Sequence, residues 1–282
     1  MKNISNHLVS VIIPNFNYGF YIDEAIRSVL NQTYKYIEIV VVDDGSTDDS
    51  VDKIKRYGNK IRLVETENQG SCAARNLGLL KSSGGFIAYL DADDNWDEEK
   101  VEMQLTFLKK SRADLVFCEM RSIGVPSKIE NLGTPNVVNH NWFFNNPGST
   151  PFAPSSVLMT RDLAARVGGW NTSLTGPAED FDYFRKCAKF GEIRGLKITL
   201  VNHRQHRESL TSINSKRYFE DNLRVVRLML TEDIQRISIV RRFKIRLDIR
   251  SKFLKHAIKT KDFLLVSQVL KSFFRANSSN SN

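Results

Sequence analysis

Four short apolar runs alternate with helix-like stretches in the N-terminal third of the chain. Three of the runs are continuous rather than alternating in polarity, which is typical of strands covered on both faces. This order predicts an α/β fold, a mostly parallel sheet flanked by helices. The expected strands are Leu8–Ile13, Ile37–Val42, Ile61–Val64 and Phe86–Leu90, and the expected helices are Tyr21–Leu30, Asp48–Tyr57 and Ser71–Lys81, the last with Ala74, Leu77 and Leu80 on its apolar side.

Polar and acidic residues follow three of these strands directly, in the segments 14–18 (PNFNY), 43–46 (DDGS) and 91–94 (DADD). The carboxyl ends of parallel strands share one edge of a sheet, where ligands bind. An acidic edge repels phosphate unless a divalent cation lies between them. Oxygen ligands suit Mg²⁺ or Mn²⁺, so the pattern predicts a metal-assisted phosphate site.

The sequence has no GxGxxG after the first strand and no GxxxxGK[ST]. The sequence therefore lacks the motif that would indicate a dinucleotide-binding enzyme and the motif that would indicate a P-loop enzyme.

The segment LDADDNWDEEK allows two interpretations. As a helix start, it uses Asp94 or Asn95 as the N-cap, and this accounts for the residues from Asn95 onward. It does not account for Asp91 and Asp93, which follow the strand directly. In an extended segment, alternation brings these two carboxylates to the same side.

The stretches VSVIIPNFNYGFYIDEAIRSVLNQTY, EIVVVDDGSTDDS, ENQGSCAARNLGL and GGFIAYLDADD occur in this order. Together they resemble the family 2 glycosyltransferases with the GT-A fold, strongly over residues 8–110 and less densely to about residue 210. The resemblance implies a nucleotide-diphospho-sugar transferase fold, a nucleotide-sugar donor that is most often a UDP-sugar, and inversion at the anomeric carbon.

The resemblance also implies roles for residues that bind the nucleotide. Pro14, Asn15 and Asn17 match the stretch that contacts the base and ribose, and Asp43 matches the aspartate that pairs with the base. Arg75 matches a basic residue near the diphosphate or base.

Four further positions belong to the same comparison. Asn68 has two possible roles: it forms a hydrogen bond to the nucleotide, or it serves only the conformation of its loop. In Asp91-Ala92-Asp93, which matches the DXD motif, Asp91 is directed to the ribose or sugar and Asp93 to the metal. Asp94 remains an alternative metal ligand.

An inverting transfer needs a base to take the proton of the acceptor hydroxyl. The segment GPAEDFDYF offers Glu179 and Asp180, which in another interpretation only cap the following helix. The resemblance assigns Asp180 as the base and Glu179 as a contact to the acceptor or sugar. Asp182 is expected to face solvent.

Less specific signals surround this motif. Trp170 either packs on a sugar ring or belongs to the core, and His206 is a candidate metal ligand or phosphate contact, assisted by Arg207 and Ser209. Residues 121–152 are expected to be loops that shape the acceptor pocket.

The net charge of +9 is concentrated at the C-terminal end. From residue 241 onward, eleven Lys and Arg face only Asp248 and Asp262, whereas residues 1–240 hold 30 basic and 30 acidic groups. The change predicts a GT-A domain over 1–212 and a basic helical extension over 213–282, helical from 216 to 276. Residues 241–275 suit an anionic membrane surface, a homo-oligomer contact or a solvated helix pair. Nucleic acid is disfavoured because the segment lacks a recognisable module with aromatic stacking partners.

The three cysteines are too few and too scattered for a disulfide framework. No stretch has the length of a signal peptide core or a membrane span, so we expect a cytoplasmic protein, with peripheral attachment to the inner face of the membrane as an option.

The combined hypothesis is an inverting, metal-dependent glycosyltransferase that uses Mn²⁺ or Mg²⁺. It transfers a sugar to a glycan or lipid-linked acceptor in cell-surface polysaccharide synthesis. The alternative is a non-catalytic scaffold of the same fold that docks on a membrane through its basic tail.

Overall fold

The computed structural model describes residues 7–124, 129–130, 135–174, 177–205, 215–235, 237–259 and 261–275. The chain divides into two compact units. The first comprises Met1–His140, Pro151–Ser173 and Asp182–Arg207, and the second Asn141–Thr150, Leu174–Phe181 and Glu208–Asn282. Two internal segments thus join the C-terminal helices in the second unit, while the domain boundary at residue 212 stays a prediction.

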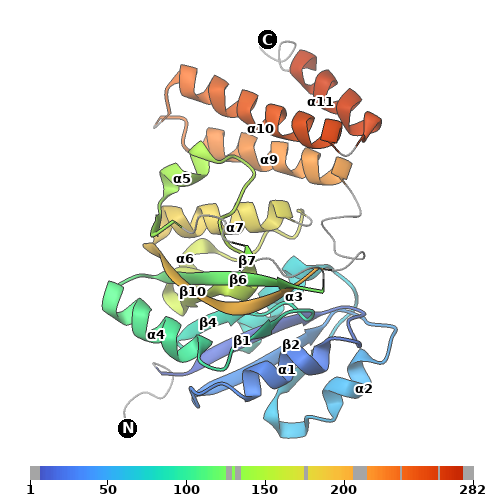
Figure 1. The fold of residues 1–282 in the computed structure, drawn as a ribbon, viewed down its shortest axis with the longest axis vertical. Coiled ribbons are helices and arrows are strands. Elements are labelled where there is room, and N and C mark those ends of the chain that lie inside the picture. The colour runs from blue at the N-terminus through green and yellow to red at the C-terminus, as the bar shows by residue number, and fades with distance from the viewer. Residues whose placement is uncertain are drawn as a thin grey trace. The chain divides into compact units, whose positions relative to one another are not determined.

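The first unit is built on one mixed sheet (Figure 1). Its N-terminal half consists of four parallel strands in the order β3-β2-β1-β4. They are β1 (Val9–Asn15), β2 (Ile37–Asp43), β3 (Arg62–Glu65) and β4 (Phe86–Tyr89). All four predicted strands are confirmed. In register, Asn15 lies beside Asp43, so the ends of β1 and β2 meet at one edge.

The sheet continues beyond β4 in the order β9-β6-β10-β5, with β7 beside β6 and β8 beside β10. β9 runs antiparallel to β4 and β6, whereas β10 is parallel to β6. The strands are β5 (Asn95–Trp96), β6 (Leu115–Ile123), β7 (Ile129–Glu130), β8 (Val137–Val138), β9 (Val157–Thr160) and β10 (Ile193–Arg204).

Helices cover both faces of the parallel half because its strands are apolar on both sides. Val40 and Val42 pack with Ala74 on one face, whereas Ile39 and Val41 belong to a larger cluster on the other. Ala74 lies on α3 (Ser71–Lys81), and the larger cluster includes α1 (Ile22–Leu30) and α4 (Lys100–Ser111). The α/β fold class is confirmed.

Three local expectations in this half are corrected. Helix α2 (Ser50–Lys55) is shorter than predicted and begins after Asp49. Leu80, expected on the buried side of α3, is exposed. Helix α4 begins only at Lys100, with Glu99 as its N-cap, because Asn95–Trp96 forms strand β5.

The middle of the chain contains more regular structure than the loops expected over residues 121–152. It has the end of β6, the short strands β7 and β8, and α5 (His140–Asn145). Two 3₁₀ turns, at Gly58–Lys60 and Pro154–Ser156, and helices α6 (Arg161–Val167) and α7 (Pro177–Phe190) complete the set before β10.

In its described residues, the stretch predicted to be helical forms α9 (Ser215–Glu232), α10 (Ile239–Lys259) and α11 (Phe263–Arg275), all in the second unit. Their common core includes Phe219 and Phe253, whose ring centroids are 4.8 Å apart. The Lys252 amine donates to the carbonyl of Gly148 over 3.0 Å, so α10 also fixes the segment 141–150. In the described ranges, no helix is both long and apolar enough to cross a bilayer.

Candidate active site

The ends of β1 and β2 are joined by hydrogen bonds to one buried carboxylate. Asp43 accepts from Asn15 Nδ2 (2.7 Å), from the Ser46 amide (2.9 Å) and from Ser46 Oγ (2.7 Å). These donors fix its orientation. The Oδ1 atom of Asn15 is also buried, and no described residue donates a hydrogen bond to it. Such an orphaned acceptor at a ligand-binding edge suits a ligand N–H or O–H group.

Asn17 links the same two loops through its backbone and side chain. It has a positive φ of 59°, a conformation that asparagine tolerates better than most residues. Its amide donates to Ser46 Oγ (2.9 Å), and its Oδ1 accepts from the Thr47 amide (2.7 Å). Pro14 lies half-buried near the end of β1.

The loop before α3 is held by Asp44. Its carboxylate accepts from the amides of Gln69 (2.9 Å) and Gly70 (2.7 Å). Gly45 has φ +79°, and a Cβ there would lie 3.0 Å from the Asn68 amide nitrogen. Asn68 itself is exposed on this fixed loop, where its side chain can meet a ligand.

Arg75 is a buried cation held by an anion and an aromatic ring. Its Nη2 lies 2.9 Å from Asp91 Oδ1, and its guanidinium lies 4.6 Å from the ring centroid of Trp170. Arg75 is therefore not a solvated surface charge. The pair connects α3 with the end of β4.

Trp170 is 3% exposed and belongs to the core, which decides between its two predicted roles. Its ring stacks on Tyr183 with 3.9 Å between centroids and 7° between planes. Asn76 accepts from the Trp170 amide (2.8 Å) and donates to its carbonyl (2.9 Å). Burial raises the pKa of Tyr183 well above 10, so its hydroxyl stays neutral.

The acidic motif is a turn rather than the expected extended segment. The Asp94 amide donates to the Asp91 carbonyl over 3.0 Å, which closes a four-residue turn. Ala92 is buried under the turn, and Asp91 and Asp93 are half-buried. The alternation argument for the DXD pair was therefore wrong, although both carboxylates remain partly accessible.

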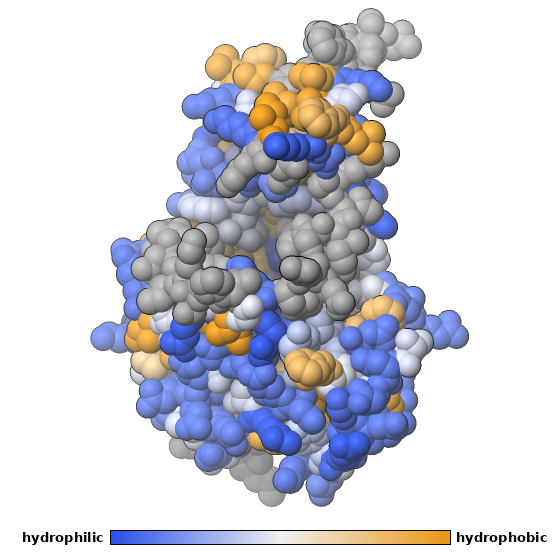
Figure 2. Space-filling view, turned by 45° about the vertical axis from the view of Figure 1, so that its right-hand side comes forward, coloured by the Kyte–Doolittle hydropathy of each residue, from blue (hydrophilic) through white to orange (hydrophobic). Residues whose placement is uncertain are grey.

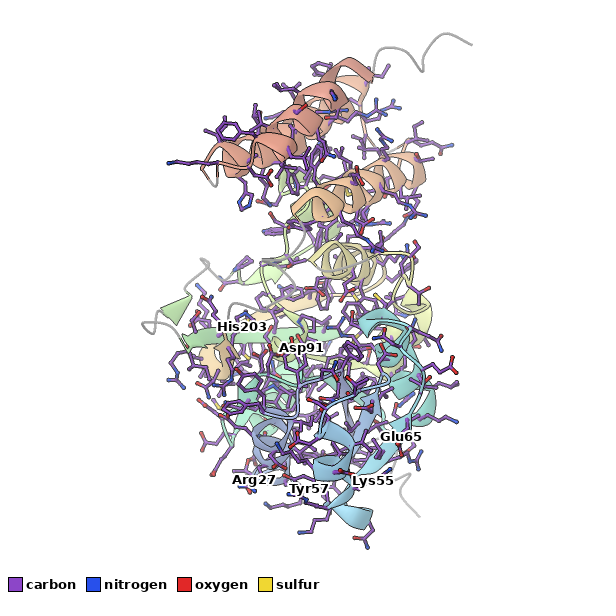
Figure 3. All side chains as sticks on the ribbon, turned by 90° about the vertical axis from the view of Figure 1, so that its right-hand side faces the viewer. Arg27, Lys55, Tyr57, Glu65, Asp91 and His203 are labelled. Carbon is purple, nitrogen blue, oxygen red and sulfur yellow. The ribbon has the colours of Figure 1, made fainter. Side chains whose placement is uncertain are left out.

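Asp94 is a structural carboxylate and not a helix cap. It is buried and accepts from Ser155 Oγ (2.6 Å) and from the Arg204 amide (2.9 Å). His203 Nδ1 lies 3.2 Å from its Oδ1. These contacts fasten the turn to the end of β10, and Figure 3 shows Asp91 and His203 at this edge.

Asp93 lies at the turn with its carbonyl fixed, because Arg204 Nε donates to that oxygen over 2.9 Å. Among the residues with described positions, no group of three or more His, Cys, Asp or Glu side chains could hold a metal ion. His206, the second predicted ligand, lies outside the described residues, as do Arg207 and Ser209.

Glu179 and Asp180 lie in the first turn of α7, which begins at Pro177. In the second unit, Phe181 packs on Phe143 with 5.7 Å between centroids. Burial raises the pKa of Tyr218, and the negative charge of Asp180 adds to this effect. Glu179 is buried, whereas Asp180 is half-buried.

Asp182 does not face solvent, contrary to the expectation. It is 1% exposed and lies 2.8 Å from Arg185 Nη2 and 2.6 Å from Lys186 Nζ. Arg185 is itself fully buried. Asp182 is therefore a structural ion-pair partner on α7, the helix that also carries Asp180.

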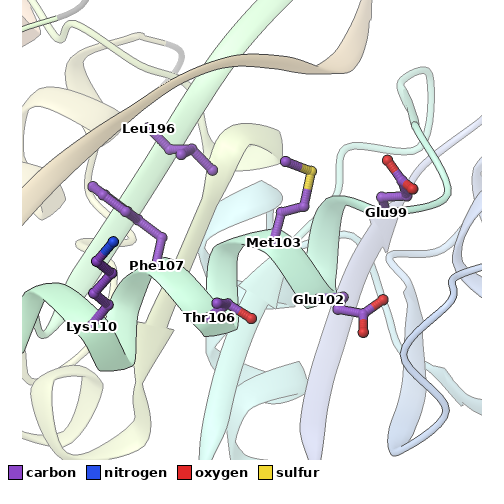
Figure 4. Close-up of a pocket in the computed structure, with 7 residues that line it drawn as sticks. All are labelled: Glu99, Glu102, Met103, Thr106, Phe107, Lys110 and Leu196. Carbon is purple, nitrogen blue, oxygen red and sulfur yellow. The ribbon is translucent and has the colours of Figure 1, made fainter.

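Two shallow surface hollows lie apart from these residues. One, of about 420 Å³, runs along α4 (Figure 4). The other, of about 460 Å³, lies by α1 and β5. Neither is lined by Asp43, Arg75, Asp91 or Asp93.

Sequence reasoning missed three residues that organise this edge: Ser155, Tyr183 and Arg204. Each acts through a contact to a residue far away in the chain. No local motif marked them.

The four parallel strands β3-β2-β1-β4 carry an ordered set of carboxylates and amides at their carboxyl ends, where α/β sheets of this kind bind their ligands. The sequence profile described as "Glycosyl transferase family 2" matches residues 10–161. The chain belongs to this family and is a glycosyltransferase.

Curated relatives agree with this assignment. An uncharacterized glycosyltransferase of Haemophilus influenzae is 38% identical over 191 residues, which are 64% of this chain and 72% of that protein. The Escherichia coli UDP-Glc:alpha-D-GlcNAc-diphosphoundecaprenol beta-1,3-glucosyltransferase WfgD is 34% identical over 51% of this chain and 58% of its own length. A Rickettsia felis glycosyltransferase matches at 46% identity, but over only 17% of its length.

Solved structures share the fold. Staphylococcus aureus TarS 1-349 in complex with UDP-GlcNAc has a TM-score of 0.74 at 20% identity, covering 95% of this chain and 81% of that one. The Pyrobaculum calidifontis mannosyltransferase PcManGT, in complex with GDP-Man and Mn²⁺, has a TM-score of 0.59 at 20% identity, covering 97% of this chain and 76% of that one.

Proposed function

We propose that the protein is an inverting, metal-dependent glycosyltransferase that moves a sugar from a UDP-sugar to an acceptor hydroxyl in cell-surface glycan synthesis. The observation that carries the proposal is the ion pair of buried Arg75 with half-buried Asp91 on the sheet edge that also holds Asp43 and Asn15. One edge thus offers groups for a base, a sugar and a diphosphate. WfgD is named for UDP-Glc, and TarS was solved with UDP-GlcNAc.

Asp43 and Asn15 bind the nucleobase of the donor. A uracil ring presents an N–H donor between two carbonyl oxygens. The oriented carboxylate of Asp43 and the orphaned Oδ1 of Asn15 are acceptors that suit such a donor. Asn17 and Pro14 shape the wall beside them, and Asn68 reaches the nucleotide from the neighbouring loop.

The metal-binding role belongs to Asp93. Asp93 is half-buried and therefore partly accessible to an ion, whereas Asp94 is buried and accepts hydrogen bonds from Ser155 and Arg204. Mg²⁺ or Mn²⁺ takes carboxylate and diphosphate oxygens together, so one protein carboxylate fits such a site. When bound, the ion would neutralise charge on the departing diphosphate. His206 remains a candidate second ligand.

The base is Asp180. It takes the proton of the acceptor hydroxyl while the acceptor oxygen bonds to the anomeric carbon and the carbon–diphosphate bond breaks. Its place in the first turn of α7 favours the charged carboxylate, because the helix dipole is positive there. Glu179 contacts the acceptor or the sugar.

The test is a transfer assay with UDP-sugars and lipid-linked or soluble glycan acceptors, with anomeric configuration followed by NMR. We expect a product of inverted configuration that depends on Mn²⁺ or Mg²⁺. Donor binding without turnover for every acceptor, by folded protein, would support the scaffold alternative. A product of retained configuration would refute the role of Asp180.

A further inference from the structure

Helix α10 carries an exposed apolar stripe on the side opposite its buried one. Val240 is 80% exposed and Phe243 65%, and Leu247 and Ile258 are exposed in the same way. Their spacing of three, four and eleven residues keeps them on one side of a helix. The opposite side is buried and consists of Ile245, Ile249, Phe253 and Ala257.

Helix α11 repeats this arrangement on a smaller scale. Phe263 is 80% exposed, and Leu270 is exposed two turns later, whereas Leu265 and Val269 are buried. Figure 2 shows apolar side chains gathered beside hydrophilic ones over the C-terminal helices. Soluble monomers rarely leave so many large apolar side chains together in water, so the surface indicates a binding partner.

Basic residues flank the apolar stripe. Within its 21 residues, α10 has eight Lys and Arg and a single acidic residue, Asp248. Lys244 and Lys255 lie exposed on one flank of the stripe, and Arg246 lies on the other. Long basic side chains of this kind extend their charges past an apolar surface to reach anionic groups.

We propose that this face docks on an anionic lipid bilayer. The interfacial face is defined as Val240, Phe243, Leu247 and Ile258 on α10 with their basic flanks. An apolar stripe bordered by Lys and Arg is the pattern of helices that lie in the plane of a membrane surface. The apolar side chains enter the headgroup boundary, and the basic ones attract anionic headgroups.

Charge decides between a bilayer and a second copy of the chain. Two copies meeting through this face would bring two strongly basic helices together, and like charges oppose such contact. An anionic headgroup layer satisfies both parts of the face at once. The proposal goes beyond the glycosyl transfer, and its test uses no enzymatic readout, so the two can fail separately.

The experiment is co-sedimentation of the full chain with phosphatidylcholine vesicles and with vesicles that also contain phosphatidylglycerol. We expect binding to the anionic vesicles only, weakened by salt. Changing Lys244, Arg246 and Lys255 together to Gln should lower the partition coefficient about 100-fold, since each basic residue contributes about fivefold. Phe243→Ser with Leu247→Ser should lower it about tenfold or more.

A matched control removes equal charge elsewhere. Arg56, Lys60 and Lys197 are exposed in the first unit, and their combined change to Gln should leave vesicle binding unchanged. Thermal unfolding of every variant verifies that the fold is intact. Failure of the wild-type chain to bind anionic vesicles would overturn the proposal. So would equal losses in the control, or a dimer in light scattering that Phe243→Ser with Leu247→Ser dissociates.

Discussion

Charged groups are buried at the sheet edge but exposed on the C-terminal helices. At the edge, carboxylates such as Asp43 and Asp94 are buried and held by several donors. On α10, charged residues such as Lys244 and Lys255 are exposed beside exposed apolar side chains. The edge is a pre-organised site for a small ligand, whereas the helices present an adaptable surface for a large one.

The largest expected effect separates chemistry from binding at Asp180. Asp180→Asn keeps the shape of α7 but removes the proton acceptor. We expect kcat to fall about 10²- to 10⁴-fold, as for other general bases, with UDP affinity and melting temperature unchanged. Steady-state kinetics and calorimetry measure both. Undiminished turnover would exclude Asp180 as the base.

Asp182 provides the structural counterpart two positions along the same helix. Asp182→Asn leaves the fully buried Arg185 without its carboxylate, which should lower the free energy of unfolding by roughly 3 kcal/mol. Urea denaturation measures the loss. If the variant is as stable as the wild type but inactive, the roles assigned to Asp180 and Asp182 are reversed.

The burial of Lys100, which lies outside the sheet edge, should make the stability of the protein depend on pH. Lys100 is buried, donates to Gln104 Oε1 (2.8 Å) and lies 3.8 Å from the Trp96 ring centroid. Burial lowers its pKa from 10.5 to about 8. The unfolded chain therefore holds the proton more tightly, and the cost of burying the charge is present below pH 8 and relieved as the pH rises towards 10.5.

This cost amounts to roughly 3 kcal/mol. Urea denaturation from pH 7 to pH 10 should show that stability relative to Lys100→Met rises with pH above 8. Lys109→Met, an exposed position on the same helix, should show no such difference. The comparison with a variant is needed because burial raises the pKa of Cys118 to about 11, which acts in the opposite direction above pH 9. A pH-independent difference for Lys100→Met would refute the prediction.

Asp94 should show a smaller structural effect without loss of metal dependence. Asp94→Asn weakens the links to Ser155 and Arg204 and should cost about 2 kcal/mol of stability. Asp97→Asn, at a half-exposed site nearby, should cost about 0.5 kcal/mol or less. Nucleotide binding by Asp94→Asn should still respond to Mn²⁺. Loss of that response in the folded variant would indicate that Asp94, and not Asp93, binds the metal.

The sequence predicted what depends on local pattern. Continuous apolar runs marked β1, β2 and β4, and polar residues after them marked the edge. It failed where a residue's environment comes from distant segments. For Asp94 the sequence offered only a helix cap or a metal ligand, because its partners Ser155 and Arg204 lie 61 and 110 positions away. Trp170, which lies in a loop, could not be placed without Tyr183 on α7.

The burial of Asp182 could not be predicted for the same reason. Its spacing from Arg185 and Lys186 permits an ion pair, but an exposed helix face shows the same spacing. Only the packing of α7 distinguishes the two.

The most direct test of the account is calorimetric titration with UDP-, GDP- and dTDP-sugars, with and without Mn²⁺, on the wild type and Asp93→Ala. We predict that one UDP-sugar binds at least tenfold more tightly with Mn²⁺, and that Asp93→Ala loses this dependence while it remains folded. Metal-independent binding in both proteins, or an unchanged response in Asp93→Ala, would contradict the proposed site.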